Sequence, residues 1–319
     1  MHQFSRSSWR FQHLRPVLIG IAAIGIAALL LSSCSLLLKD PRVGQSDRNP
    51  NALLGLPSSA TSFNANDYLI NRSQYVMSYN RSKAIPNWAS WQLNQSWLGS
   101  RPRIPFEPDD TLPSGWEKVV PNDYTGSGFD RGHVVPAADR NKTAEDSKAV
   151  FLMTNIFPQA PDNNQGPWVQ LESYCRDLVA QGKELYIVAG GAGEGGKGEK
   201  GVKGAIAQGK VSVPASTWKV VLVSDRPGSG LAGITEQTRV IAVIMPNQQG
   251  IKNTSWREYR RSVDQVEELT GYDLFSNIPE LIQEAIEAKT DANLPVKLPV
   301  KKPVRRSAKP PVKQPVGTP

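Results

Sequence analysis

The residues able to do acid–base or metal chemistry are few in this 319-residue chain. Two of its three histidines lie before residue 33, so His133 is the only imidazole in the rest of the sequence. The two cysteines are Cys34 and Cys175. A structural zinc site normally takes about four Cys or His ligands and a catalytic one about three, so the sequence lacks the ligands for either. A disulfide scaffold is excluded for the same reason.

His133 lies in the compact charged motif Asp130-Arg131-Gly132-His133. In a strand, side chains alternate, so Arg131 and His133 would share one face and Asp130 would take the other. A base that activates water near neutral pH is well served by a histidine, and the adjacent Arg131 would help to hold it neutral and offer charge to a phosphate. The alternative is an ordinary histidine that is hydrogen-bonded within the fold, and this motif alone leaves both interpretations open.

A second polar group follows at helical spacing. Asn164, Glu172 and Arg176 are separated by eight and four residues, so they point roughly one way from a helix. The alternative is a surface ion pair between Glu172 and Arg176, worth about 0.5 kcal/mol, with Asn163 or Asn164 as a helix cap. A neighbouring stripe of the same helix is apolar and predicts its buried face: Trp168, Leu171, Cys175, Leu178 and Val179.

The elements that must position these residues are mostly strands. The loop-forming segments are 106–128, rich in Pro and Gly, and 190–209, which we expect to be a mobile loop. A helix is predicted to begin at the cap residue Ser262. Short apolar stretches predict strands at 68–70, 75–77, 184–189, 211–213, 218–223 and 240–245. Strands with few crossover helices indicate one α+β domain with a largely antiparallel sheet.

Three blocks of the sequence carry a resemblance to a known family. They are Asp130-Arg131-Gly132-His133, Thr154–Gln159, and Asn163–Trp168 followed by Leu171-Glu172. In this order and spacing they resemble the secreted bacterial DNA/RNA non-specific endonucleases, and most closely the cyanobacterial sugar-non-specific type. The resemblance implies a ββα-metal nuclease fold, with a largely antiparallel central sheet flanked by helices.

The resemblance also implies a catalytic apparatus. His133 would be the general base that takes a proton from the attacking water. Asn164 would be the single direct ligand of one hydrated Mg²⁺ or Mn²⁺, and Glu172 would hold waters bound to that ion. A hard cation that keeps most of its waters needs few protein ligands, which agrees with the scarcity of His and Cys.

Phosphate binding is the remaining task that the resemblance assigns. The residues implied for substrate binding are Arg131, Arg176 and Asn155, the two arginines also stabilising the developing charge. Such nucleases often carry another arginine just before a Pro-Asp pair, where this chain has Glu107. Arg103 or Arg101 would have to replace it, or substrate binding is weaker.

The implied reaction is hydrolysis of phosphodiester bonds in double- and single-stranded DNA and RNA, leaving 5′-phosphate ends. No base-reading module is visible, which favours recognition of the backbone. Trp88, Trp91 and Trp97 are either core residues or surfaces on which bases stack. The alternative function is a catalytically silent, envelope-anchored lipoprotein that binds nucleic acid or an anionic polymer. Whether an inhibitor protein binds as well stays open.

The two ends of the chain account for its net charge of +8. Residues 1–33 hold three arginines and no acid, and residues 294–319 hold seven Lys or Arg and no acid. Residues 34–293 therefore carry 27 basic and 29 acidic residues, a net charge of −2. The overall charge is thus no evidence for a nucleic-acid partner of the central domain.

The N-terminus predicts export. An apolar run over 17–31 follows three arginines and ends in Leu31-Ser32-Ser33-Cys34, which resembles the lipobox of bacterial lipoproteins. We expect lipidation of Cys34 and a membrane-anchored lipoprotein in the periplasm or on the cell surface, or otherwise a secreted protein. The predicted organisation is a signal peptide over 1–33, a flexible tether over 34–62, the nuclease domain over 63–288 and a disordered Pro/Lys-rich tail over 289–319. That tail could bind an anionic envelope polymer.

Overall fold

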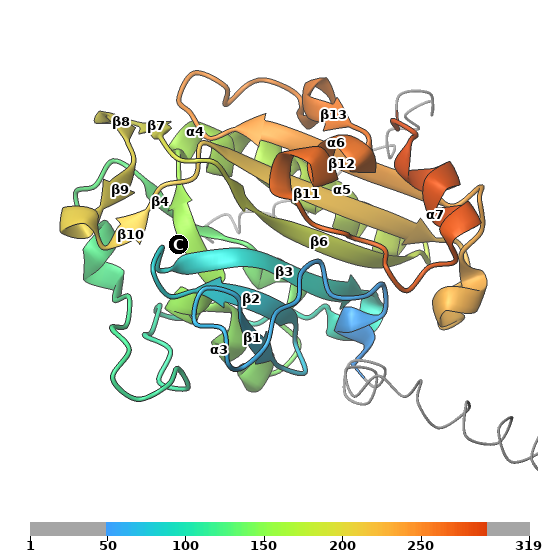
Figure 1. The fold of residues 1–319 in the computed structure, drawn as a ribbon, viewed down its shortest axis with the longest axis horizontal. Helices are drawn as coiled ribbons and strands as arrows, with labels where there is room; N and C mark the ends of the chain where they lie inside the picture. The colour runs from blue at the N-terminus through green and yellow to red at the C-terminus, as the bar shows by residue number, and fades with distance from the viewer. Residues whose placement is uncertain (1–48, 292–319) are drawn as a thin grey trace, which may run out of the picture.

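One antiparallel sheet organises the computed structural model, which describes residues 49–291 (Figure 1). Its seven strands run in the order β1-β2-β3-β6-β11-β12-β13, and every neighbouring pair is antiparallel. The strands are β1 (Tyr68–Asn71), β2 (Val76–Asn80), β3 (Ile85–Leu93), β6 (Glu184–Ala192), β11 (Ser216–Ser224), β12 (Arg239–Pro246) and β13 (Arg260–Arg261). The predicted α+β class with a largely antiparallel sheet is confirmed.

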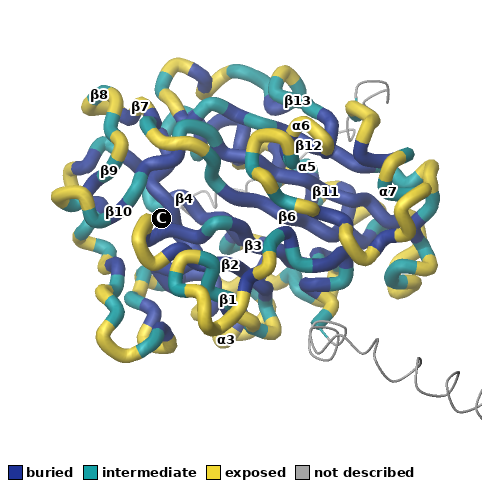
Figure 2. Tube along the Cα trace, in the orientation of Figure 1, coloured by how far each residue is buried: buried dark blue, intermediate teal, exposed yellow. Residues whose placement is uncertain are grey.

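Both faces of this sheet are covered, so its central strands are apolar on both sides (Figure 2). Along β11, Val221 and Val223 enter one hydrophobic cluster, while Trp218, Val220 and Leu222 enter the other. The first cluster is closed by α5 (Val169–Ala180), and the second by α6 (Val263–Thr270) and α7 (Glu280–Glu287). No helix within residues 49–291 is long and apolar enough to cross a membrane.

A second, two-stranded sheet carries the charged motif. β4 (Asp130–His133) pairs antiparallel with β5 (Ile156–Gln159), placing Arg131 opposite Pro158. The chain then passes through α4 (Pro161–Asn163) and a π-helical turn over Asn164–Trp168 into α5. These elements form a ββα unit on the first face of the large sheet. The short helix α3 (Ala144–Val150) lies between β4 and β5 in the chain.

The segment 190–209 is not the structureless mobile loop that its Gly and Lys content predicted. It holds the hairpin β7 (Gly196–Gly198) and β8 (Gly201–Lys203), followed by β9 (Ala205–Ile206), which pairs with β10 (Val211–Ser212). Lys200 Nζ donates to the Gly126 carbonyl at 2.6 Å, and Lys203 Nζ donates to the Ser127 carbonyl at 3.0 Å. The hairpin is therefore fixed against the turn that leads into β4.

The folded part of the chain is longer than the predicted domain. Residues 49–62 were expected to belong to a flexible tether, but Ala52, Leu54 and Ala60 are buried in the second hydrophobic cluster with Trp88. The tail also begins later than residue 289, because Asp291 pairs with Arg239 at 2.8 Å. Cys34, the predicted signal peptide and the rest of the tail lie outside the described residues.

Arg140 ties the first described residues to the sheet. Its side chain is fully buried, and its guanidinium donates to the carbonyls of Gln74 at 2.7 Å and Gln92 at 2.6 Å and to Asn51 Oδ1 at 3.2 Å. The Trp97 ring lies 4.0 Å beneath the guanidinium carbon. The segment around Asn51 is therefore held by a buried polar network as well as by apolar contacts.

Candidate active site

Strand β4 places its charged side chains on the faces that alternation predicted. Arg131 lies over the Phe106 ring at 5.7 Å, and the His133 ring lies 5.2 Å from the same phenyl ring. Asp130 points elsewhere and accepts a hydrogen bond from Asn164 Nδ2 at 2.8 Å. The strand thus links His133 and Arg131 on one side to Asn164 on the other.

His133 is held in its neutral form. Its imidazole is 8% exposed and packs against Phe106 and Phe151, with ring centroids 5.2 and 5.0 Å away. Burial, reinforced by the charge of Arg103, lowers its pKa to about 3. Its Nε2 has no hydrogen-bond partner among residues 49–291. The sequence predicted that Arg131 would hold the imidazole neutral, whereas burial and Arg103 do so.

Asn164 is held by the π-helical turn. The preceding Asn163 is fully buried and donates to the Pro246 carbonyl at 2.9 Å, which anchors the turn to the end of β12. Gly166 passes so close to Lys252 that a Cβ would lie 2.6 Å from its carbonyl oxygen. The Asn164 amide nitrogen donates to Asp130, so the Asn164 Oδ1 atom is the one available to a ligand. An amide oxygen of this kind suits a hard cation.

Helix α5 presents Glu172 and Arg176, each paired with a residue from another element. Arg176 Nη1 lies 2.9 Å from Asp139 Oδ1, and Asp139 also accepts from Trp91 Nε1 at 3.1 Å. Glu172 Oε1 lies 3.8 Å from Lys219 Nζ. The alternative of a surface ion pair between Glu172 and Arg176 is therefore wrong, because each side chain turns inward to a buried partner.

Lys219 is a site residue that the sequence analysis missed. Its side chain is 1% exposed, and its Nζ lies 4.0 Å from the centre of the Trp168 ring as well as near Glu172. Burial raises the pKa of Glu172, and the charge of Lys219 opposes that shift. A single lysine inside the apolar strand 218–223 was the available signal, since lysine is rarely buried without a partner.

Arg103 supplies the additional positive charge at the site. Its guanidinium lies 5.2 Å over the Phe151 ring, and its charge lowers the pKa values of both His133 and Glu172. Glu107 turns away and lies 3.9 Å from Lys148 at the surface. Of the two arginines considered as replacements, Arg103 is the one whose charge acts on His133 and Glu172.

Asn155, which the resemblance assigned to substrate binding, is occupied by the fold itself. Its side chain is fully buried and donates to the carbonyls of Val135 and Val150, both at 2.9 Å, while its Oδ1 accepts from the Val135 backbone nitrogen at 3.0 Å. The amide is thus committed to the backbone that follows β4. Asn155 therefore has a structural role: it holds the backbone just after the strand that carries His133.

We expect Asn155→Ala to lower the free energy of unfolding by about 3 kcal/mol, because three buried backbone groups lose their partners. Urea unfolding measures this, with Asn122→Ala as a matched control at an exposed position. KM for nucleic acid should stay near the wild-type value. A higher KM with unchanged stability would return Asn155 to the substrate site.

Trp88 and Trp91 belong to the core. Their exposed fractions are 0% and 1%, and they lie in opposite clusters of the sheet. Trp97 is partly buried beneath Arg140. Stacking of bases on Trp88 or Trp91 is therefore excluded by burial.

Lys219→Met should lower kcat about 10-fold with little change in KM, because Glu172 loses its nearest buried cation while the apolar contact with Trp168 is kept. Lys219→Arg should recover part of the loss by restoring the charge. Steady-state cleavage of a fluorescent oligonucleotide gives both constants. A change confined to KM would place Lys219 in substrate binding instead.

The geometry defines a class of protein. A histidine on the first strand of an antiparallel pair, an asparagine at the turn that follows the second strand and a glutamate on the next helix form the arrangement of a ββα-metal nuclease, built here on a large antiparallel sheet. The chain belongs to the DNA/RNA non-specific endonuclease family, whose model matches residues 56–281. It is an endonuclease of the cyanobacterial type.

Named relatives agree with this assignment. A nuclease of Nostoc sp. strain PCC 7120 is 56% identical over 234 residues, covering 72% of this chain and 82% of the Nostoc protein. The human mitochondrial nuclease EXOG is 28% identical over 65% of this chain, a match that spans 56% of the human protein. A chain of the crystal structure of the EndoG/EndoGI complex superposes with a TM-score of 0.59 at 23% identity, covering 72% of this chain and 91% of that one.

Proposed function

We propose that this nuclease cuts DNA and RNA by one mechanism, in which His133 removes a proton from water and Asn164 holds a hydrated Mg²⁺. The observation that carries the proposal is the state of His133: buried between two phenyl rings, neutral, and with an unpartnered Nε2. A neutral imidazole has one ring nitrogen without a proton, and this nitrogen can accept the proton of water.

Asn164 and Glu172 fit a hydrated divalent cation. The amide of Asn164 offers oxygen because Asp130 holds its nitrogen, and the Glu172 carboxylate, 12% exposed, keeps oxygen atoms that can accept from water. Magnesium prefers such oxygen ligands and retains several waters. When bound there, the ion would supply positive charge to the phosphate and to its leaving oxygen.

In this proposal two arginines bind the phosphate. Arg131 uses Nε and Nη2 to donate to the Pro121 carbonyl, which leaves Nη1 free of hydrogen bonds within the described residues. Arg176 is fixed through Asp139 and Ser173, which leaves its Nε. Each guanidinium is therefore held in place while part of its donor fork stays available. In-line attack by water would then leave 5′-phosphate and 3′-hydroxyl ends.

The test is incubation of the protein with plasmid DNA and with RNA, in Mg²⁺ and in EDTA. Both polymers should be degraded in Mg²⁺, and neither in EDTA. A His133→Ala preparation made in parallel reveals contaminating nuclease, since a contaminant would cut in both samples. Cleavage that persists in EDTA, or of one polymer only, would contradict the proposal.

Export and a lipid anchor at Cys34 are part of the proposal. Their support is the apolar run over 17–31 that ends in Leu31-Ser32-Ser33-Cys34, outside the described residues. The wild-type protein should partition into detergent after phase separation and Cys34→Ser should not. Equal partition of the two would remove the lipid anchor from the proposal.

A further inference from the structure

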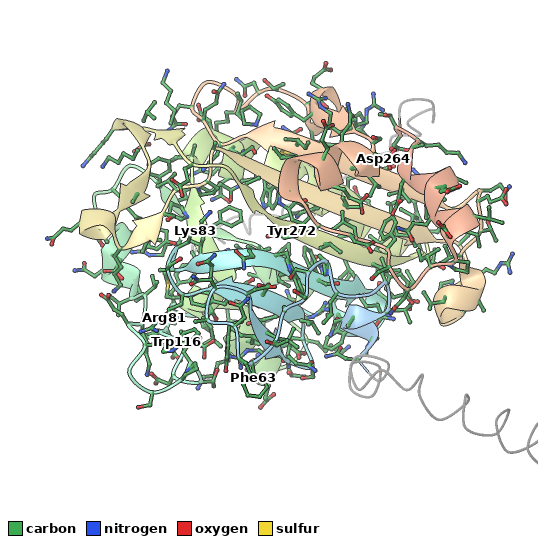
Figure 3. The ribbon with its side chains drawn as sticks, viewed as in Figure 1. Phe63, Arg81, Lys83, Trp116, Asp264 and Tyr272 are labelled. Carbon is green, nitrogen blue, oxygen red and sulfur yellow. The ribbon has the colours of Figure 1, made fainter. Side chains whose placement is uncertain are left out.

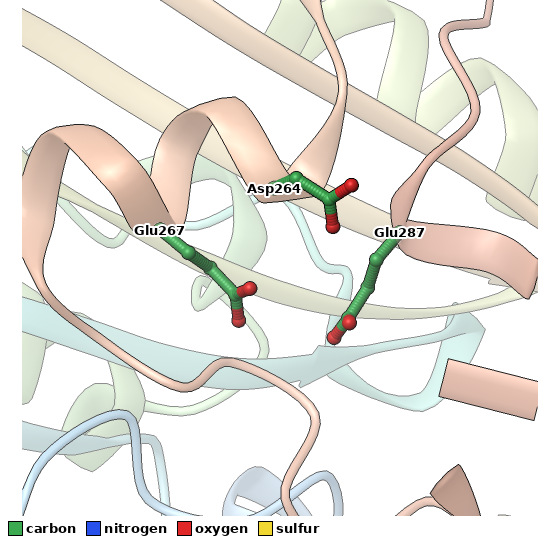
Figure 4. A group of neighbouring side chains, drawn as sticks. All are labelled: Asp264, Glu267 and Glu287. Atoms are coloured by element: carbon green, nitrogen blue, oxygen red, sulfur yellow. The ribbon is translucent and has the colours of Figure 1, made fainter. Parts of the chain in front are cut away.

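Three carboxylates meet on the face of the sheet opposite His133. Asp264 and Glu267 lie on α6, and Glu287 is the last residue of α7. One oxygen from each side chain lies within 4.8 Å of the others (Figure 4). Asp264 lies on the outer side of α6, toward solvent (Figure 3). The group therefore joins two helices and has an open side.

Glu287 lacks a partner in this group. Its residue is 6% exposed, and its Oε1 is buried without a hydrogen-bond partner among residues 49–291. Burial and the charges of Glu267, Asp264 and Asp273 raise its pKa to about 8. A buried carboxylate oxygen is costly unless a hydrogen bond or a cation compensates it. The unpartnered oxygen therefore marks a place where a ligand would be stabilising.

The neighbouring basic side chains are engaged elsewhere. Lys289 Nζ donates to the Glu236 carbonyl at 2.7 Å, and Arg239 pairs with Asp291. Within residues 49–291, no Lys or Arg forms a salt bridge with any of the three carboxylates. Glu287 also ends α7, where the helix dipole disfavours negative charge. A cation between the helices would give these carboxylates a positive partner and would offset the unfavourable helix dipole at Glu287.

We propose that Asp264, Glu267 and Glu287 bind one Ca²⁺ ion, separate from the catalytic metal at Asn164, which joins α6 to α7. Calcium takes six to eight oxygen ligands in irregular geometry, and three carboxylates whose oxygens lie within 4.8 Å of one another can supply several of them. Magnesium requires a near-ideal octahedron and gives up its waters reluctantly, so a group of carboxylates from two helices suits it less well. Glu267 keeps one oxygen for the ion while its Oε1 accepts from the Leu274 backbone nitrogen at 2.8 Å.

The experiment measures thermal unfolding of the full chain in the Asn164→Ala background, so that an ion at the catalytic site does not contribute. About 10 mM CaCl₂ should raise the unfolding midpoint by about 4 °C over NaCl of equal ionic strength. Glu287→Gln should fold, because glutamine has the same shape and carries no charge to bury, and should lose the shift. Glu284→Gln is the matched control on the exposed side of α7 and should keep it.

Titration calorimetry provides a second measurement that does not depend on stability. The Asn164→Ala protein should bind about one Ca²⁺ per chain with a dissociation constant in the range of about 0.1–1 mM, and Glu287→Gln should bind at least tenfold more weakly. No calcium-dependent shift in the midpoint, or an equal shift in Glu287→Gln, would overturn the site. An equal response to MgCl₂ would overturn the assignment to calcium.

Discussion

Replacing His133 by alanine should lower kcat/KM about 10³-fold for both DNA and RNA at neutral pH. The expected size is that of losing a general base, because the imidazole is neutral, its Nε2 is unpartnered, and His133 is the only histidine of the described chain. Initial rates on a supercoiled plasmid and on a defined RNA measure the loss. A variant that retains more than a tenth of the wild-type rate would show that another group removes the proton.

The pH dependence of stability provides an independent readout of the same residue. Below pH 6.5 the unfolded chain protonates this imidazole, while the folded chain resists protonation until about pH 3. The wild-type protein should therefore lose about 1 kcal/mol of unfolding free energy per pH unit from His133 as the pH falls through that window. Urea unfolding of His133→Ala between these limits should show a shallower decline. Parallel declines would mean that the imidazole is not buried in its neutral form.

Replacing Asn164 by alanine should also lower kcat/KM about 10³-fold, and should raise the Mg²⁺ concentration required for half-maximal rate. The reason is that this amide oxygen is the direct protein ligand in the proposed site, and a hydrated Mg²⁺ has few others to hold it. Rates measured across a Mg²⁺ titration separate weakened metal binding from slower chemistry. Wild-type rates at the wild-type Mg²⁺ requirement would remove Asn164 from the metal site.

An exchange of side chains tests how Asn164 is oriented. Asn164→Asp alone keeps an oxygen ligand, but it replaces the 2.8 Å hydrogen bond to Asp130 by two facing carboxylates. Combining it with Asp130→Asn restores a hydrogen bond, with the donor now on β4. The double variant should therefore recover at least tenfold over Asn164→Asp. If it does not, Asp130 does not orient residue 164.

Much of the site could be predicted because its signals are local. The alternation of Arg131 and His133 along β4 and the helical spacing of Glu172 and Arg176 depend only on backbone geometry, and both faces of β11 follow from its continuous apolar run. These features hold however the distant parts of the chain are arranged. Asn164, which was predicted on the same helix face as Glu172 and Arg176, lies instead in the π-helical turn before α5.

The rest depends on contacts between distant segments. Lys219 reaches Glu172 only because β11 passes beneath α5. A lysine within an apolar strand indicates a buried charge, but the sequence does not indicate which residue is its partner. In the sequence, Asn155 resembles a polar site residue. In the fold it is buried, and its amide nitrogen and oxygen both form hydrogen bonds with the backbone. Residues 49–62 have the composition of a linker. Their few buried apolar side chains belong to the same hydrophobic cluster as Trp88, which is distant in the sequence.

The buried network around Arg140 limits how far the chain can be shortened from its N-terminal side. Asn51 supplies one of its acceptors, and Asp139, the residue next to Arg140, fixes Arg176 at the active site. A protease that cleaves before residue 49 leaves this network intact. Cleavage a few residues later would remove Asn51 and loosen the support of Asp139 and, through it, of Arg176. Shortening of the chain is therefore compatible with an intact site only when the cut falls upstream of Asn51.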